Sequence, residues 1–386
     1  MKPEIILKDL IKIPSYLNGK DKNRNESRVG DFIFSYLKKF KFLKLEKQNL
    51  GNGRKNIIAR TEGKPRILIA GHMDTVIPKH GKFDPFSCKI TGDKLYGLGS
   101  LDTKGGIASL LSALNKVTSL QNTTLLFYCD EEYDFRGMKK FLNSYNLRKT
   151  PDLALVIEPT HLDICNAHRG LIEFKFSVWG ESGHSANPRT ARNSNLFLFE
   201  LMGEIKNYLL NFKHPFLGYP SFNVSYMQGG LYQGIKGNDL MLSGEGNNIP
   251  DYAEAVFEIR TTKDELNAGI IRDKIRRFAL TKGFEIDDFQ IRHDLSPLFT
   301  DPKGIKNLIA AVREKNKKSK ILDPSTRGYS DGQLISQHLK IPVVYLGPGG
   351  DGMHASHEYV LISTLRKLES VYLNILRRFN CISCWL

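Results

Sequence analysis

Four short apolar runs recur along the chain, and each is nearly free of polar residues. They are RILIA at 66–70, TLLFY at 124–128, LALVI at 153–157 and IPVVYL at 341–346. Such runs are typical of strands buried on both faces, as in a parallel sheet covered by helices. Between the first two, residues 105–117 carry apolar side chains at helical spacing. The pattern predicts a β-α-β unit within an α/β fold whose mixed, mainly parallel sheet is flanked by helices.

The middle of the chain has a different pattern. Apolar and polar side chains alternate at 172–178, as in a strand with one solvated face. We then expect a helix at about 194–211, strands near 222–227 and 253–259, a helix at about 263–280 and a strand near 284–291. This β-α-β-β-α-β order is that of a ferredoxin-like layer, with an extra strand near 240–242. We therefore predict a catalytic domain at 1–167 and 293–386, with a second domain inserted at 168–292.

Length and composition agree with a globular protein of about two domains. The chain has 386 residues, of which 41% are hydrophobic and 25% charged. No apolar run approaches the roughly 20 residues that span a bilayer, and the first residues lack a signal-peptide pattern. We expect a cytosolic protein with no membrane partner.

The formal net charge of +15 raises the alternative of a nucleic-acid-binding protein. Lysine and arginine are spread over several segments, however, and are not gathered with aromatic residues in a recognised module. A basic solvated surface is the simpler interpretation. A non-catalytic nucleic-acid-binding protein is therefore kept only as a remote alternative.

The five cysteines are few and odd in number, which argues against a disulfide framework. Cys381 and Cys384 form an isolated C-x-x-C motif with no second pair near it. We therefore expect no structural zinc site there.

Side chains that can bind metal follow the predicted strands. They are His72, Asp74, Asp102, Glu131, Glu132, Glu158 and His354. Because open α/β sheets place their ligands at the carboxyl ends of the strands, we expect these groups to lie close together. Each short pattern alone is weak, but their recurrence at successive strand ends indicates one site. Nitrogen and oxygen ligands without cysteine suit catalytic zinc, cobalt or manganese.

This arrangement resembles a family of hydrolases with two co-catalytic metal ions. The family contains acetylornithine deacetylase, succinyl-diaminopimelate desuccinylase, aminoacylase and glutamate carboxypeptidase, and the similarity runs from about residue 57 to residue 360. By this resemblance, His72 and Glu158 would hold one divalent ion. Glu132 and His354 would hold the other, and Asp102 would bridge both. The ions would be Zn²⁺, with Co²⁺ or Mn²⁺ as alternatives.

The resemblance also implies roles for residues beside the ions. Asp74 would orient His72 without binding metal. Glu131 would be the general base, left uncoordinated so that it can take a proton from water and pass it to the leaving nitrogen. A cis peptide bond would join Asp102 to Thr103.

The inserted domain carries further matches to the family. The motif GHSANP contains His184 and resembles the segment whose histidine reaches into the active site of a partner subunit. The domain would therefore serve as a lid and would form a homodimer. Arg260 would bind the substrate carboxylate, with Asn247 in support and Ser330 as a further contact. Glu358 matches the family pattern without a clear role.

Three motifs resemble acetylornithine deacetylases most closely. They are EPT at 158–160, AHRG at 167–170 and the GHS that contains His184. Departures from the family pattern, such as Leu98 and Tyr133, remove no ligand. We therefore expect hydrolysis of the amide bond of a small N-acyl amino acid. Desuccinylase activity and metal-dependent carboxypeptidase or dipeptidase activity are the alternatives.

Overall fold

The computed structural model describes residues 1–17, 25–81, 84–237, 239–324 and 329–380, so Cys381 and Cys384 lie outside the described residues. The chain forms two compact units. The first comprises Met1–Ala167, Phe299–Asp323 and Ser330–Leu386, and the second comprises His168–Leu298 and Pro324–Tyr329. The second unit extends past residue 292 because strand β15 (Glu285–Leu295) pairs with its neighbour as far as Leu295.

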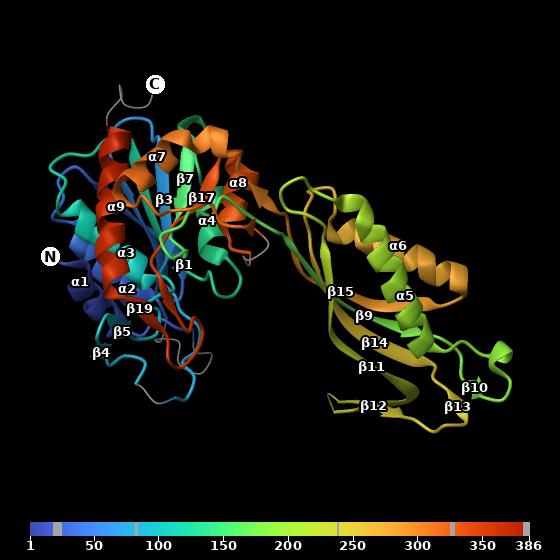
Figure 1. The fold of residues 1–386 in the computed structure, drawn as a ribbon. Coiled ribbons are helices and arrows are strands. Elements are labelled where there is room, and N and C mark those ends of the chain that lie inside the picture. The colour runs from blue at the N-terminus through green and yellow to red at the C-terminus, as the bar shows by residue number, and fades with distance from the viewer. Residues whose placement is uncertain (18–24, 82–83, 238, 325–328, 381–386) are drawn as a thin grey trace. The chain divides into compact units, whose positions relative to one another are not determined.

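The first unit is built on a six-stranded sheet in the order β1-β2-β6-β3-β7-β17 (Figure 1). The strands are β1 (Lys44–Gly51), β2 (Arg54–Arg60), β3 (Ile67–His72), β6 (Thr123–Tyr128), β7 (Leu153–Val156) and β17 (Val343–Tyr345). Strands β6, β3, β7 and β17 are parallel and coincide with the four apolar runs, whereas β2 is antiparallel to both β1 and β6. The predicted mixed, mainly parallel sheet is confirmed. The β1–β2 pair was not predicted, because β1 is a solvated strand without an apolar run.

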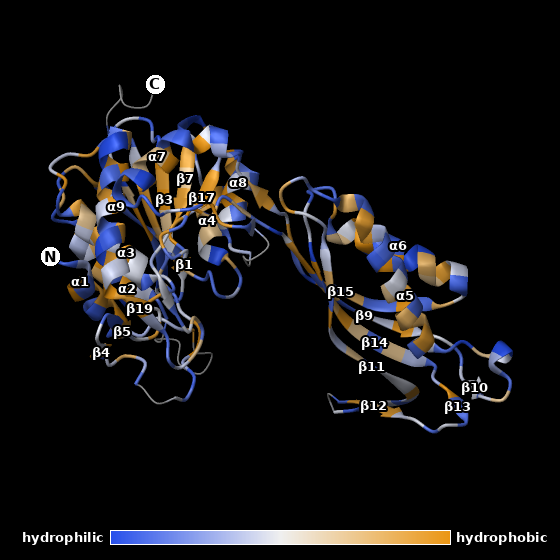
Figure 2. Ribbon diagram, in the orientation of Figure 1, coloured by the Kyte–Doolittle hydropathy of each residue, from blue (hydrophilic) through white to orange (hydrophobic). Residues whose placement is uncertain are grey.

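Helices cover both faces of this sheet. They are α1 (Pro3–Ile11), α2 (Ser27–Leu37), α3 (Lys104–Leu114), α4 (Arg136–Asn143), α7 (Lys306–Lys315), α8 (Gly332–Leu339) and α9 (Ile362–Asn380). Ile67 and Ile69 share a buried cluster with α1, α2, α3, α7 and α9, whereas the alternate residues Leu68 and Ala70 point to the opposite face of the sheet. Figure 2 accordingly shows hydrophobic strands between helices whose outer surfaces are largely hydrophilic.

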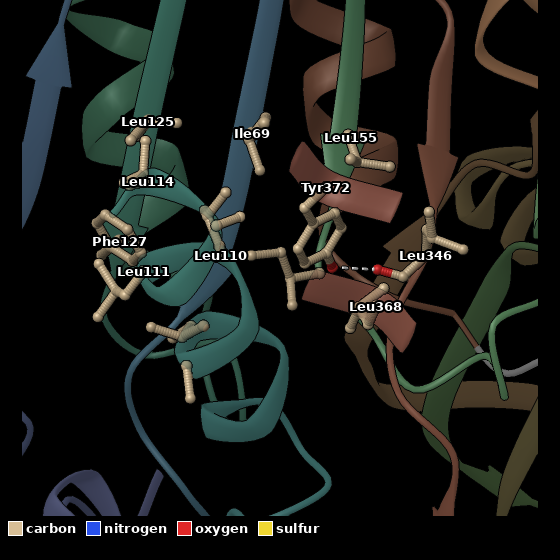
Figure 3. Packing of buried hydrophobic residues seen from close by; sticks show 14 of the residues in the cluster. Ile69, Leu110, Leu111, Leu114, Leu125, Phe127, Leu155, Leu346, Leu368 and Tyr372 are labelled. Carbon is tan, nitrogen blue, oxygen red and sulfur yellow. Dashed lines mark hydrogen bonds between the residues drawn. The ribbon is translucent and has the colours of Figure 1, made fainter. Parts of the chain in front are cut away.

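The packing of α3 and α9 fixes the loops that follow the strands. Leu111 and Leu114 of α3 are fully buried near Phe127 of β6 (Figure 3). Each such side chain contributes roughly 1.5–3 kcal/mol through removal from water. The buried hydroxyl of Tyr372 in α9 donates a hydrogen bond of 2.7 Å to the carbonyl of Leu346, one residue past β17. This bond anchors the start of the segment that leads to His354.

A second, small sheet joins two distant parts of the first unit. Its strands are β4 (Ile90–Thr91), β5 (Lys94–Tyr96), β18 (Gly350–Asp351) and β19 (Tyr359–Leu361), in the order β18-β19-β5-β4. Tyr96 pairs with Tyr359. The pairing brings the chain just before Asp102 beside the chain just after His354. Strands of two or three residues are too short to produce a recognisable sequence pattern.

The second unit contains a five-stranded antiparallel sheet in the order β12-β11-β14-β9-β15. Besides β15, the strands of this sheet are β9 (Leu171–Trp179), β11 (Ser221–Lys236), β12 (Asp239–Ser243) and β14 (Tyr252–Arg260). The unit also contains α5 (Ser194–Leu209), α6 (Ala268–Lys282) and the short strands β10 (Gly183–His184) and β13 (Asn248–Ile249). The order β9-α5-β11-β14-α6-β15 is the predicted β-α-β-β-α-β order. Short strands β8 (Ala167–His168) and β16 (Leu298–Phe299) lie where the chain passes between the units.

Besides β15, strand β11 and helix α6 differ in extent from the prediction. Strand β11 has 16 residues, because its second half pairs with β12 to form a hairpin of mostly exposed side chains. Helix α6 begins at Ala268 instead of residue 263, since the side chain of Asn267 caps it by accepting a hydrogen bond from the N–H of Ile270. Among the described residues, no helix has the length and hydropathy needed to span a membrane.

Candidate metal centre

Two groups of possible metal ligands lie at the carboxyl end of the parallel strands. The first consists of His72, the last residue of β3, Asp102, just before α3, and Glu158, which follows β7. Each contributes one ligand atom, and these atoms lie within 4.8 Å of one another. His72 Nε2 lies 3.0 Å from Asp102 Oδ1. The spacing is compact enough for one cation to contact all three.

The second group consists of Asp102, Glu132 and His354. Nε2 of His354 lies 3.1 Å from Glu132 Oε2 and 3.3 Å from Asp102 Oδ2. This nitrogen is buried and forms no hydrogen bond of standard geometry. A ring nitrogen that faces two carboxylate oxygens can bind a cation that takes the place of its proton. Asp102 directs Oδ1 toward one group and Oδ2 toward the other, as a bridging carboxylate requires.

The backbone at Asp102 has an unusual conformation and a direct link to β3. The Asp102–Thr103 peptide bond is cis, in agreement with the expectation from the family resemblance. The hydroxyl of Thr103 donates a hydrogen bond of 2.9 Å to the carbonyl of His72. The loop that carries Asp102 is therefore attached directly to the end of β3.

Asp74 contacts both His72 and the segment that carries Glu131. Nδ1 of His72 lies 3.1 Å from the Asp74 carbonyl oxygen and 3.6 Å from its carboxylate. The carboxylate accepts hydrogen bonds from the N–H groups of Glu131 (3.2 Å) and Glu132 (3.1 Å). A proton on Nδ1 that points at the Asp74 carbonyl leaves Nε2 of His72 with a free lone pair for a metal. Asp74 thus orients the imidazole mainly through its backbone, while its carboxylate holds the neighbouring loop.

A buried ion network lies behind the same loop. The guanidinium of Arg54 donates hydrogen bonds to Glu26 (2.7 Å) and to Asp130 (2.6 Å), and all three side chains are almost fully buried. Asp130 immediately precedes Glu131 and has a left-handed backbone with φ of 70°. No sequence pattern indicated this network, because Glu26 and Arg54 are far from any metal-binding motif.

Glu131 belongs to neither group of ligands. Burial raises the pKa of the Glu131 carboxyl well above its ordinary value, and the charge of Glu158 adds to this effect while His72 opposes it. Burial also raises the pKa of Glu158 well above its usual range, with Asp102 acting in the same direction. So many carboxylates gathered out of water repel one another, and this makes the site favourable for divalent cations.

His354 and Asp102 stabilise each other's charged forms. The side chains of Asp102 and then Glu132 raise the pKa of His354 to about 10, with burial opposing them. Burial works against ionisation of Asp102, but His354 and His72 lower its pKa below the ordinary range. The bridging carboxylate is therefore ionised at neutral pH, as a metal ligand must be.

Ser330 lies beside the first ligand group. The sequence had not predicted a role for the adjacent Asp331. The Ser330 hydroxyl lies 3.4 Å from Glu158 Oε1. Asp331 is fully buried and accepts a hydrogen bond of 2.7 Å from the hydroxyl of Tyr128. Burial raises the pKa of Asp331 to about 7. Its position one residue after Ser330 was the only available sequence signal.

His184 and Asn247 are neighbours in the second unit, whereas Arg260 is distant from them. Strands β10 and β13 pair His184 with Asn248, and the N–H of Ser185 donates a hydrogen bond of 2.9 Å to the Asn247 carbonyl. Strand β14 follows β13 and ends at Arg260. Its nine residues, at about 3.3 Å each, separate its two ends by roughly 26 Å. One copy of this unit therefore does not bring Arg260 beside His184.

Contacts within the second unit hold the side chain of Arg260. Nε of Arg260 donates a hydrogen bond of 2.8 Å to Glu258 Oε1. Its guanidinium carbon lies 5.6 Å from the ring centroid of Tyr329, which is within the range of a cation–π contact. The side chain is about 30% exposed, so the guanidinium is partly accessible to a ligand.

Comparison with known proteins agrees with this geometry. Residues 68–378 match the model of peptidase family M20/M25/M40. An acetylornithine deacetylase from Buchnera aphidicola subsp. Schizaphis graminum is 30% identical over an alignment of 402 positions, which covers 97% of both chains. An M20 family metallo-carboxypeptidase from Sulfolobus solfataricus has the same fold, with a TM-score of 0.73, 19% identity and coverage of 98% of this chain and 100% of the other.

A dinuclear metal-binding M20 peptidase from Bacillus subtilis also has this fold. Its TM-score is 0.65 at 17% identity, with coverage of 97% of this chain and 98% of the other. At these identities the solved structures show the fold, and the family match with the full-length relative establishes membership. The chain belongs to peptidase family M20/M25/M40 and is a hydrolase that acts on amide bonds.

Proposed function

We propose that this protein is a two-metal deacylase that removes the acyl group from a small N-acyl amino acid, with N-acetylornithine as the leading candidate substrate. The observation that carries the proposal is the pair of ligand groups that share Asp102, with Glu131 beside them and outside both groups. The full-length similarity to an acetylornithine deacetylase supports the choice of substrate class. Desuccinylation and dipeptide hydrolysis are the alternatives that an assay must separate.

The ligand set supports two divalent ions, and we propose Zn²⁺, with Co²⁺ or Mn²⁺ as alternatives. His72 and Glu158 would hold one ion and Glu132 and His354 the other, with Asp102 between them. Imidazole and carboxylate ligands without cysteine are typical of catalytic zinc sites. When bound, two such metal ions lower the pKa of a water molecule and polarise the scissile carbonyl group.

Glu131 would act as the general base. Its segment is fixed by the Asp74 carboxylate on one side and by the Arg54–Asp130 ion pair on the other. A carboxylate held in this way can accept a proton from water without binding a metal, and can then donate it to the leaving nitrogen. The raised pKa makes the Glu131 carboxylate a stronger proton acceptor than an ordinary glutamate.

Arg260 would bind the α-carboxylate of the substrate. A guanidinium can bind a carboxylate through two parallel hydrogen bonds, which gives geometric selection as well as affinity. Glu258 and Tyr329 limit the orientations of the Arg260 side chain. Ser330, which lies beside Glu158, would offer a further polar contact.

His184, supported by Asn247, would complete the active site of a second copy of the chain in a homodimer. Its distance from Arg260 within one unit supports a contribution in trans. One face of α5 exposes Leu196 and Phe199, Leu210 just past the end of the helix is also exposed, and the space around the Cα of Gly203 is open. Such an apolar face with a small residue suits the close approach of another helix.

The outer edge of β11 offers a second contact for the same dimer. Residues 221–230 of β11 pair with β14 on one side, whereas β12 pairs only with residues 231–236 on the other. Among the described residues, the outer edge of 221–230 therefore has no strand partner. An open strand edge next to an apolar helix face supports association of two inserted units.

The decisive experiment is a metal analysis combined with a substrate panel. Purified protein is assayed with N-acetylornithine, N-succinyl-diaminopimelate and a dipeptide, before and after chelation and after addition of Zn²⁺ or Co²⁺. We expect about two metal ions per chain, loss of activity on chelation and preference for the acetylated substrate. Turnover of the dipeptide alone would contradict the deacylase assignment, and full activity after complete metal removal would contradict the metal centre.

A further inference from the structure

Glu358 is a buried carboxylate that contacts the loop of the bridging residue Asp102. Its Oε2 accepts a hydrogen bond of 2.9 Å from the N–H of Gly99. Its Oε1 accepts two more, from the N–H groups of Leu101 (2.8 Å) and Asp102 (3.1 Å). Three backbone donors that converge on one carboxylate form an anion-binding cradle made by the protein's own loop.

The backbone of Glu358 is attached to the segment that carries His354. The N–H of Glu358 donates a hydrogen bond of 3.3 Å to the Ala355 carbonyl, and the N–H of Ala355 donates one of 2.9 Å to Gly352. The Glu358 carbonyl accepts a hydrogen bond of 3.1 Å from the N–H of Gly97. One residue therefore connects the loop of Asp102 with the turn of His354.

This connection matters because the carboxylate of Asp102 is directed toward the two ligand groups and cannot also hold its own loop. Oδ1 faces His72 and Oδ2 faces His354, at 3.0 Å and 3.3 Å. A displacement of the loop at residues 99–102 would move both oxygens relative to His354. The spacing between Asp102 and His354 therefore depends on a contact behind the site.

We propose that Glu358 is a positioning residue that fixes Asp102 relative to His354 and thereby sets the affinity of the centre for its metal ions. The inference rests on the proposed metal centre and adds a residue outside the ligand set. A carboxylate is required at this position, because only two acceptor oxygens satisfy three N–H donors. Glutamine has one acceptor oxygen and would turn an NH₂ group toward at least one of these donors.

The test is a metal titration of chelator-treated protein with Co²⁺. Uptake is followed by calorimetry and by the visible absorption of the bound ion, which reports ligand geometry. The variants are Glu358→Gln, Glu358→Asp and the control Glu369→Gln. Glu369 is also a buried carboxylate, but it binds Ser112 and Lys116 in the contact between α3 and α9.

We expect Glu358→Gln to weaken Co²⁺ binding about ten- to a hundredfold and to change the absorption spectrum, as is typical when a group that orients a ligand is lost. Glu358→Asp keeps the charge but shortens the side chain, so its affinity should lie between those of Glu358→Gln and the wild type. Glu369→Gln should lower thermal stability and leave the affinity and the spectrum unchanged.

A folded Glu358→Gln variant with wild-type Co²⁺ affinity and spectrum would overturn the inference, even if its melting temperature were lower. If Glu358→Gln does not fold, Glu358→Asp decides, and wild-type affinity in that variant would overturn the inference. Wild-type protein that takes up fewer than two Co²⁺ ions would instead overturn the proposed metal centre. The two failures are thus distinguishable.

Discussion

Oδ1 of Asp102 lies 3.0 Å from Nε2 of His72, although 30 positions separate the two residues in the chain. Because the other oxygen of Asp102 faces His354, replacement by asparagine leaves an NH₂ group where one ion would need a ligand. We predict that Asp102→Asn lowers the metal content below two ions per chain and reduces kcat/KM at least a hundredfold. Elemental analysis and initial rates check this result.

Asp152→Asn is the matched control, because Asp152 is an exposed carboxylate that pairs with Arg66 in the same unit. It should retain its metal and its activity. An Asp102→Asn variant that keeps both ions and full turnover would refute a bridging role.

Glu131→Gln should separate metal binding from catalysis. Glu131 lies outside both ligand groups, so the variant should keep its metal content and its Co²⁺ spectrum. Loss of the general base should lower kcat about 10²- to 10⁴-fold with little change in KM. Single-turnover rates and metal analysis on the same preparation test this. If metal is lost together with activity, Glu131 is a ligand and the division of roles is wrong.

Mixing of inactive variants tests whether His184 acts in trans. Glu131→Gln and His184→Ala should each be nearly inactive as homodimers. A mixed dimer would contain one intact site, which combines Glu131 of one subunit with His184 of the other. Equal co-expression should therefore restore about one quarter of wild-type activity, because half of the dimers are mixed and each has one working site.

Co-expression of Glu131→Gln with Asp102→Asn is the control for this experiment, since both changes lie in the same unit of each chain and no intact site can form. If the pair with His184→Ala recovers no more activity than this control, His184 does not complete a partner's site.

His168 should make the stability of the protein depend on pH. Burial lowers the pKa of this histidine from 6.5 to about 4, while its Nδ1 lies 2.9 Å from the Arg169 carbonyl oxygen. Between these two pKa values the unfolded chain binds the proton and the folded chain does not. The contribution of His168 to the free energy of unfolding is therefore complete above pH 6.5 and is lost as the pH falls toward 4.

Between pH 7.5 and pH 5, His168 should lower the free energy of unfolding by about 2 kcal/mol. Denaturant unfolding of wild type and His168→Gln at the two pH values measures it. The variant should show a smaller drop, whereas substitution of the exposed His338 should show the wild-type drop. Equal drops in wild type and His168→Gln would show that His168 is not the group that titrates.

Much of the fold follows from local patterns. The apolar runs predicted β3, β6, β7 and β17, because a strand buried on both faces needs apolar residues at consecutive positions. Alternation predicted β9 and β14 for the complementary reason, since one face of that sheet is solvated. By contrast, β1 and the second half of β11 are exposed strands whose pairing leaves no periodic signal.

Three candidate ligands could be named from the sequence because His72, Glu132 and Glu158 lie at or just past the ends of parallel strands, which meet at one edge of a sheet. The sequence could not show that Asp102 turns one oxygen toward each ligand group, since that depends on the loop before α3 and on Thr103 bound to the end of β3. Nor could it identify Asp331 or Arg54 as neighbours of the site, because their partners are distant in the chain.

The sequence by itself determined which residues carry the imidazole and carboxylate groups of the site and which predicted strands these residues follow. Periodicity and composition are local properties, so they can be read without a fold. Only the tertiary structure decided how Glu358 joins the loop of Asp102 to the turn of His354. That contact links residues 256 positions apart through backbone N–H groups, and backbone groups carry no sequence signature.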